Sequence, residues 1–238
     1  MKLPLQGLIL AGPVLALWLG GAQSTQGGVP QRAQSWTEEF ALDSGELTST
    51  GRNPYFVLEP GYRLVLEDGA ERLTITVLAE TRMVKGVETR VVEERETKAG
   101  TPVEVSRNYF AISRRTNSVF YFGEDVDIYS NGKVTSHEGG WLAGTKGARP
   151  GLMMPGLPLL NARYYQELAP GVAMDRAQIV SFSDSRTTPA GTFAKVLRVE
   201  ETSPLEPGHK ESKLYARGVG LLQDGSLTLV RYGADTTR

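Results

Sequence analysis

Apolar and polar residues alternate along much of the chain. In the run from Leu73 to Ala79 the odd-numbered positions are apolar, while Thr74 and Thr76 fall on the opposite face. Alternation with a period of two is typical of a β-strand with one buried face. The turn sequence EDGAE precedes this run, so residues 62–80 predict a β-hairpin.

The same pattern recurs further along the chain. Two long β-branched runs within residues 84–113 are joined by KAGTP and predict a second hairpin, and SVFYFGED is apolar on both faces, as in a strand covered on both sides. Strand-length runs bounded by Gly, Pro or Asp continue to residue 233, and no amphipathic helical pattern longer than about three turns occurs among them. The sequence therefore predicts an all-β protein with a long antiparallel sheet.

One apolar stretch, Gly147–Ala162 (GARPGLMMPGLPLLNA), does not alternate. Its three prolines cannot donate to a ladder, so it predicts a loop rather than a strand. Its large apolar side chains either pack as ordinary core or form a lid over an internal cavity, and the first interpretation agrees with the usual burial of such residues. The lid interpretation makes the following residues candidates for ligand binding: Leu152, Met153, Met154, Leu157 and Leu160.

The N-terminus predicts export. A single lysine precedes the apolar run Leu3–Leu19, and Gly20 and Ala22 supply the small residues of a cleavage site, so residues 1–22 resemble a signal peptide. The alternative is an uncleaved anchor, but the run is short for a span of about 20 residues and contains prolines and glycines. We therefore expect a periplasmic or secreted protein that begins near Gln23 and has no stable membrane span.

The composition of the rest predicts one domain. Residues 23–50 are polar and predict a linker, with a possible turn of helix at Trp36–Leu42. Residues 51–233 carry the strand patterns and predict the antiparallel domain, and residues 234–238 form a tail.

Charge and cysteine content exclude several classes of function. The chain has 238 residues, 22% of them charged, with a formal net charge of -1, and nucleic-acid binders usually carry a basic face instead. No cysteine is present, which excludes disulfides, thiolate metal sites, cysteine nucleophiles and the lipid-modified cysteine of a lipoprotein. We expect no nucleic-acid partner and no cofactor.

The segment YFGEDVDIYSNGKVTSHEGGW (residues 121–141) looks most like a chemical site. Its Asn131-Gly132 pair is a strong hairpin signal, because a type I′ turn needs positive φ at both central residues. Glu124, Asp125 and Asp127 could bind calcium, but their spacing is not that of an EF-hand loop. The sequence favours a solvated acidic hairpin and no metal site.

Catalytic motifs are scarce. There is no G-x-S-x-G elbow, His137 lacks the second histidine of a zinc helix, and His209 lies in a predicted exposed turn. The acidic run Glu93–Glu96 could supply the paired carboxylates of a glycoside hydrolase, but it is more typical of a solvent-exposed strand. No catalytic residue is predicted.

Three stretches carry a resemblance: NPYFVLEPGYRLVLE, VFYFGEDVDIYSNGKV and KLYARGVGLL. They resemble uncharacterised exported bacterial proteins in which an N-P-Y-F-x-L-x-P-G opening precedes a long antiparallel sheet. That set is similar in architecture to the LolA/LppX-like group, whose strongly curved sheet half-wraps an apolar cavity under a lid. The resemblance implies a half-barrel or open barrel and matches no ligand residue to this chain.

The leading expectation is thus an exported, non-catalytic protein that binds a hydrophobic or lipid-like ligand on the concave face of its sheet. One alternative is an envelope interaction or structural module with a filled core, and a less favoured one is a carboxylate-dependent hydrolase. An apolar cavity above about 300 Å³ would favour the carrier, whereas a solid core would favour the interaction module. The sequence leaves the ligand and the oligomeric state open.

Overall fold

The computed structural model describes residues 35–234, and a single large antiparallel sheet of 15 strands dominates them. The first strands are β1 (Leu47–Thr48), β2 (Gly51–Asn53), β3 (Phe56–Leu58), β4 (Tyr62–Asp68), β5 (Glu71–Val84), β6 (Val87–Lys98), β7 (Thr101–Ser113), β8 (Val119–Ser130) and β9 (Lys133–Ser136). The remaining strands are β10 (Trp141–Leu142), β11 (Gly151–Met154), β12 (Arg163–Tyr165), β13 (Arg176–Thr188), β14 (Gly191–Ser203), β15 (Glu206–Ala216), β16 (Gly220–Asp224) and β17 (Leu227–Ala234). The predicted all-β class is confirmed.

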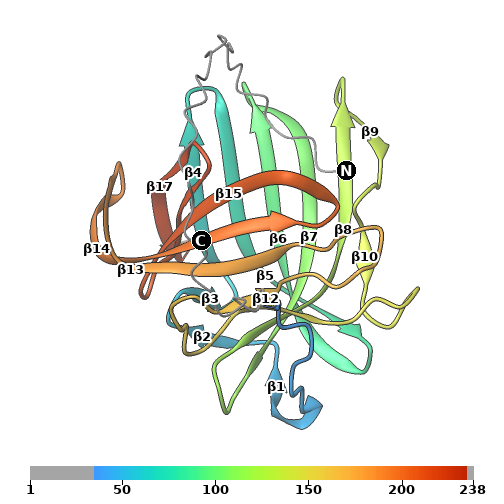
Figure 1. Cartoon of the computed structure of the whole chain (residues 1–238). Coiled ribbons are helices and arrows are strands. Elements are labelled where there is room, and N and C mark those ends of the chain that lie inside the picture. Colours follow the sequence, from blue (N-terminus) through green and yellow to red (C-terminus); the bar gives the residue numbers. More distant parts are fainter. Residues whose placement is uncertain (1–34, 235–238) are drawn as a thin grey trace, which may run out of the picture.

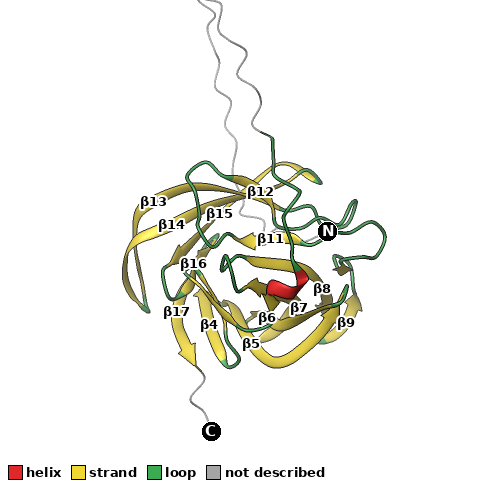
Figure 2. Ribbon diagram, turned by 90° about the horizontal axis from the view of Figure 1, so that it is seen from below, coloured by secondary structure: helices red, strands yellow, loops and turns green. Residues whose placement is uncertain are grey.

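The sheet curls around an interior without closing. Its order is β10-β8-β7-β6-β5-β4-β17-β16-β15-β14-β13-β12, with β1 added to β7 and with β9 and β11 added to β8, while β2 and β3 form a separate pair. In Figure 1, β5–β8 run upright and β13–β15 cross in front of them, and Figure 2 shows these two groups on opposite sides of the interior. The core therefore lies between two halves of one sheet.

The predicted hairpins are present. β4 and β5 pair across the EDGAE turn, and β6 and β7 pair across KAGTP. Asn131 and Gly132 join β8 to β9 with φ values of 51° and 73°, so the Asn-Gly prediction is confirmed. The prediction that His209 is exposed is confirmed, but the residue lies within β15 and not in a turn.

The predicted helical turn at Trp36–Leu42 is wrong. Instead, the Thr37 amide donates to the Arg163 carbonyl at 3.0 Å, and the Thr37 carbonyl accepts from the Tyr165 amide at 2.9 Å. The edge of β12 thus satisfies backbone groups that a short helix would have left open at its ends. The described part of the predicted linker is bound to the sheet, whereas residues 1–34 and 235–238 lie outside the described residues.

The apolar stretch Gly147–Ala162 is not entirely a loop as predicted, because Gly151–Met154 forms β11 on the edge of β8. Pro150 and Pro155 flank this strand, so no proline interrupts its ladder. A Cβ built on Gly151 would lie 2.1 Å from the Gln166 carbonyl oxygen, which explains why a glycine starts the strand.

A buried arginine fixes the segment around β1 to the sheet. Arg90 on β6 is 6% exposed, and its guanidinium donates to the carbonyl oxygens of Ser49 at 2.9 Å and Ala79 at 2.6 Å. It also donates to Thr50 Oγ1 at 2.8 Å. Ala79 lies where the β5–β6 register shifts between Val77 and Thr81. Arg90 therefore donates to a carbonyl group that has no partner strand residue at this irregularity.

Candidate functional site

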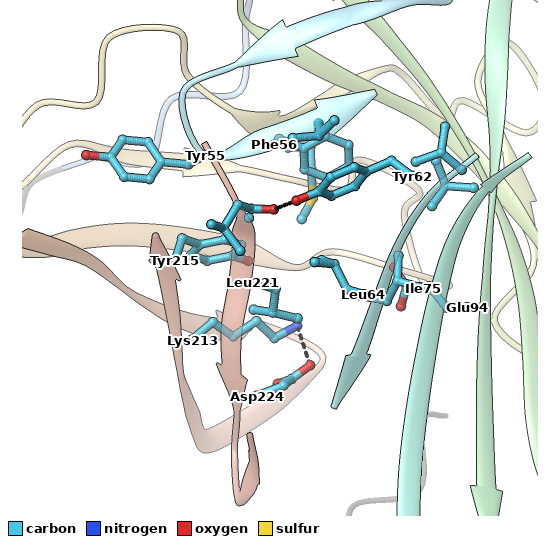
Figure 3. Close-up of a pocket in the computed structure, with 16 residues that line it drawn as sticks. Tyr55, Phe56, Tyr62, Leu64, Ile75, Glu94, Lys213, Tyr215, Leu221 and Asp224 are labelled. Atoms are coloured by element: carbon cyan, nitrogen blue, oxygen red, sulfur yellow. Dashed lines mark hydrogen bonds and ion pairs between the residues drawn. The ribbon is translucent and has the colours of Figure 1, made fainter. Parts of the chain in front are cut away.

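A cleft of about 70 Å³ opens between the two halves of the sheet (Figure 3). Its first wall comes from the residues before and within β3 and from β4–β6, and its second wall comes from β15, β16 and the turn between them. The lining residues are Tyr55, Phe56, Val57, Tyr62, Leu64, Ile75, Val77, Val92, Glu94, Met153, Lys213, Tyr215, Val219, Gly220, Leu221 and Asp224.

The walls are mainly apolar and aromatic. Strand alternation brings Tyr62 and Leu64 of β4 to the interior, and Ile75 and Val77 of β5 join them through the β4–β5 register. The Tyr62 hydroxyl donates to the Val219 carbonyl at 2.8 Å, and burial raises the pKa of Tyr62 to about 12. Its hydroxyl therefore stays protonated at neutral pH, and its ring forms part of the cleft wall.

The opposite end of the cleft is charged (Figure 3). Lys213 Nζ lies 3.0 Å from Glu201 Oε2 and 3.5 Å from Asp224 Oδ2. Burial alone would lower the pKa of Lys213, but Asp224 and Glu201 together hold it well above its usual value. Lys213 is therefore an ammonium group at neutral pH and unsuited to act as a base.

Further polar groups surround this ion pair. Gln166 Nε2 donates to Glu201 Oε1 at 3.0 Å, which satisfies the second oxygen of that carboxylate. Burial raises the pKa of Glu211, with Asp224 and Glu201 adding to the effect and Lys213 opposing it. Lys213 is thus surrounded by several carboxyl groups.

Two buried polar atoms of this cluster have no hydrogen-bond partner among residues 35–234. They are Asp224 Oδ1 and the hydroxyl of Tyr164, a residue that is 3% exposed. Burial, then the charge of Glu201, raises the pKa of Tyr164, and Tyr164 is in turn one of several groups that raise the pKa of Tyr215. Tyr164 and Glu201 both lie opposite Ala177, on the strands to either side of it, so the Tyr164 hydroxyl is near this cluster although Tyr164 does not line the cleft.

The residues proposed from the sequence to bind a ligand are scattered. Met153 lines the cleft, Leu152 is half-buried against the core, and Met154 is 1% exposed in the core. Leu157 and Leu160 are 78% and 57% exposed and do not line the cleft. The structure thus brings one of the five to the cleft.

The acidic hairpin residues face in different directions, as strand alternation requires. Glu124 is 2% exposed, whereas Asp125 on the other face lies 2.5 Å from Arg82 Nη1 and accepts a hydrogen bond from the Tyr109 hydroxyl at 2.7 Å. Asp127 Oδ1 lies 2.9 Å from His137 Nδ1. In the described part of the chain, no three His, Cys, Asp or Glu residues are grouped so that they could hold a metal ion.

Sequence reasoning missed Lys213, Asp224 and Glu201, because these residues come from three different strands. One signal was present: Lys213 is two residues before Tyr215, so it lies on the inward face of β15. A charged residue at an inward-facing position of a strand is uncommon unless it is paired with an opposite charge.

No protein-family model, no curated protein and no solved structure matches the chain. The resemblance to the LolA/LppX-like group therefore remains a prediction. Within residues 35–234, no helix has the length and apolar character needed to cross a membrane.

Proposed function

We propose that the protein is a non-catalytic binding protein that takes the apolar part of a small amphipathic ligand into the cleft. The observation that supports this proposal best is the cleft itself, with aromatic and aliphatic walls and charged groups at one end. Ligand sites generally combine such apolar walls with a few placed polar groups. In this proposal the open sheet works as a half-barrel, and its concave face holds the ligand.

The size of the cleft limits the ligand. Its volume of about 70 Å³ is well below the value of about 300 Å³ at which pockets for whole drug-sized ligands begin. A complete acyl chain does not fit into this volume, so a lipid-like ligand would insert only one end. We therefore favour a ligand with a short apolar end over a fully enclosed lipid.

The state of the polar groups favours binding over hydrolysis. Lys213 is held as an ammonium group, and both oxygens of Glu201 are engaged, by Lys213 and by Gln166. Export, predicted from residues 1–22, is also part of this proposal, although those residues lie outside the described ones.

A titration with 1-hexanol followed by ¹H–¹⁵N NMR tests the proposal. We expect saturable shifts at amides around the cleft, such as those of Val57, Ile75 and Leu221. Ile75→Trp fills the cleft and should abolish these shifts, whereas Thr76→Trp, on the other face of the same strand, should retain them. The absence of saturable shifts at the cleft of the folded wild type, both with 1-hexanol and with its charged analogues of the same chain length, would refute the proposal.

The interaction module remains the second candidate, because three large apolar side chains are exposed within one loop. Leu157, Leu159 and Leu160 are 78%, 61% and 57% exposed. Exposed apolar patches often mark interaction sites. Shifts that concentrate at these leucines instead of at the cleft would favour this candidate.

A further inference from the structure

The charged end of the cleft carries more negative than positive groups. Among residues 35–234, Lys213 is the one basic residue that lines the cleft, and Asp224 lines it beside Lys213. Glu201 lies directly behind Lys213 at 3.0 Å, and the pKa of Glu211 responds to the same charges. The electrostatic potential at this end therefore disfavours a second anion and favours a cation.

Asp224 is a carboxylate of this end whose charge is only partly compensated by neighbouring donors. Its Oδ2 lies 3.5 Å from Lys213 Nζ, beyond the 2.7–2.9 Å that is usual for a charge-assisted hydrogen bond. Its Oδ1 is buried and has no hydrogen-bond partner among residues 35–234. A buried carboxylate oxygen without a donor costs free energy, and a cation beside this carboxylate would reduce that cost.

The unpaired Tyr164 hydroxyl is a second, independent sign of an unfilled polar site. Tyr164 is 3% exposed and, as shown above, lies near the cluster that includes Glu201 and Tyr215. Tyr164 does not line the cleft, so its hydroxyl would reach a head group only through a bridging water. The cluster thus offers hydrogen-bonding capacity that the described residues do not use.

The aromatic walls fit the same kind of ligand. Phe56, Tyr62 and Tyr215 line the cleft, and Figure 3 shows Tyr215 on the same side as Lys213 and Asp224. The face of an aromatic ring attracts cations, and this attraction grows where water is excluded. An ammonium group would therefore find both a carboxylate and the Tyr215 ring at this end.

We propose that the ligand of the cleft is an organic amine, with its apolar end between β4, β5 and β16 and its ammonium group beside the Asp224 carboxylate. This inference rests on the proposed function, because it names the head group of the ligand that the cleft takes. It distinguishes the protein from carriers of fatty acids, whose carboxylate would meet Asp224 as a like charge.

Three probes of the same chain length test the inference: hexylamine, 1-hexanol and hexanoate, titrated at pH 7.5 and followed by the NMR shifts of cleft amides. We expect hexylamine to bind about tenfold more tightly than 1-hexanol, because its hydrogen bond to the carboxylate is charge-assisted, and we expect hexanoate to bind most weakly. If hexanoate or 1-hexanol binds as tightly as hexylamine, the amine inference fails and the proposed function stands. If none of the three binds, both fail.

Asp224→Asn then tests the placement of the ammonium group. We expect this variant to lose about tenfold in affinity for hexylamine and to change less than about twofold for 1-hexanol, which also shows that the cleft is intact. Asp184→Asn is the matched control, because Asp184 is paired with Arg198 at 2.7 Å and does not line the cleft. Unchanged hexylamine affinity in Asp224→Asn, or an equal loss in Asp184→Asn, would overturn the inference.

Discussion

At the scale of single residues, the charged end of the cleft contains a carboxyl group whose burial reduces stability. Glu211 sits where burial and the neighbouring Asp224 and Glu201 disfavour its ionised form, and the attraction of Lys213 offsets this only in part. Its pKa in the folded state is therefore above the ordinary value of 4.5. An acid with a raised pKa binds its proton more tightly when folded, so its contribution favours folding at low pH and is lost as pH rises through the folded pKa.

Replacing Glu211 by Gln should remove this loss of stability at neutral pH. We expect Glu211→Gln to be more stable than the wild type at pH 7, and the difference should shrink as pH falls to values below 4.5, where the wild-type carboxyl group becomes protonated in both states. Urea unfolding at a series of pH values measures the effect. Glu39→Gln, at an exposed position, serves as the control. A Glu211→Gln variant that is less stable than the wild type at pH 7 would contradict this prediction.

At the scale of elements, local sequence predicted strands better than it predicted their partners. The hairpins β4–β5, β6–β7 and β8–β9 follow from alternation and turn residues, which are properties of neighbouring positions. β11 was missed because its four residues pair with β8, a contact that only the folded chain provides. The cleft was missed for the same reason, since Lys213 and Glu94 come from strands far apart in the sequence.

The strand β11 and the loop after it should respond differently to mutation. Met154 is 1% exposed, so Met154→Ala should cost about 2–5 kcal/mol in the free energy of unfolding through loss of buried contacts and formation of a cavity. Leu157 is 78% exposed, so Leu157→Ala should change that free energy by less than about 0.5 kcal/mol. Urea denaturation of both variants provides the comparison. Similar losses in the two variants would show that Leu157 is buried in solution.

At the scale of the whole molecule, the two halves of the sheet meet where β4 pairs with β17. Residues 62–68 pair with residues 227–234, so the ladder joins the beginning of the sheet to the end of the chain. The cleft lies beside this junction, because β4 and β16 both line it and both lie next to β17 in the sheet. The geometry of the cleft therefore depends on two strands that are far apart in the sequence. Such pairings form slowly during folding, and no local sequence pattern predicts them.

Leu66 and Leu229 lie opposite each other at this junction, and both are fully buried. Each substitution by Ala should cost about 2–5 kcal/mol, and the double variant should depart from additivity by about 0.5–3 kcal/mol because the two side chains occupy neighbouring space. A double-mutant cycle measured by urea unfolding gives the coupling. Leu66 and Val119 serve as a reference pair, because they lie on strands that do not pair with each other. The changes that their substitutions cause in the free energy of unfolding should be additive. Strict additivity of Leu66 and Leu229 would contradict the pairing.

The attachment of Thr37 to β12 has a consequence for how copies of the protein behave in crowded solution. A sheet that does not close ends in strands whose free amide and carbonyl groups can recruit a strand from another molecule, which is a common start of aggregation. The backbone of Thr37 occupies part of that edge at β12, through its bonds to Arg163 and Tyr165. Proteolysis just after Thr37 would therefore uncover this edge without removing any residue that lines the cleft, and we expect the cleaved protein to aggregate faster than the intact one.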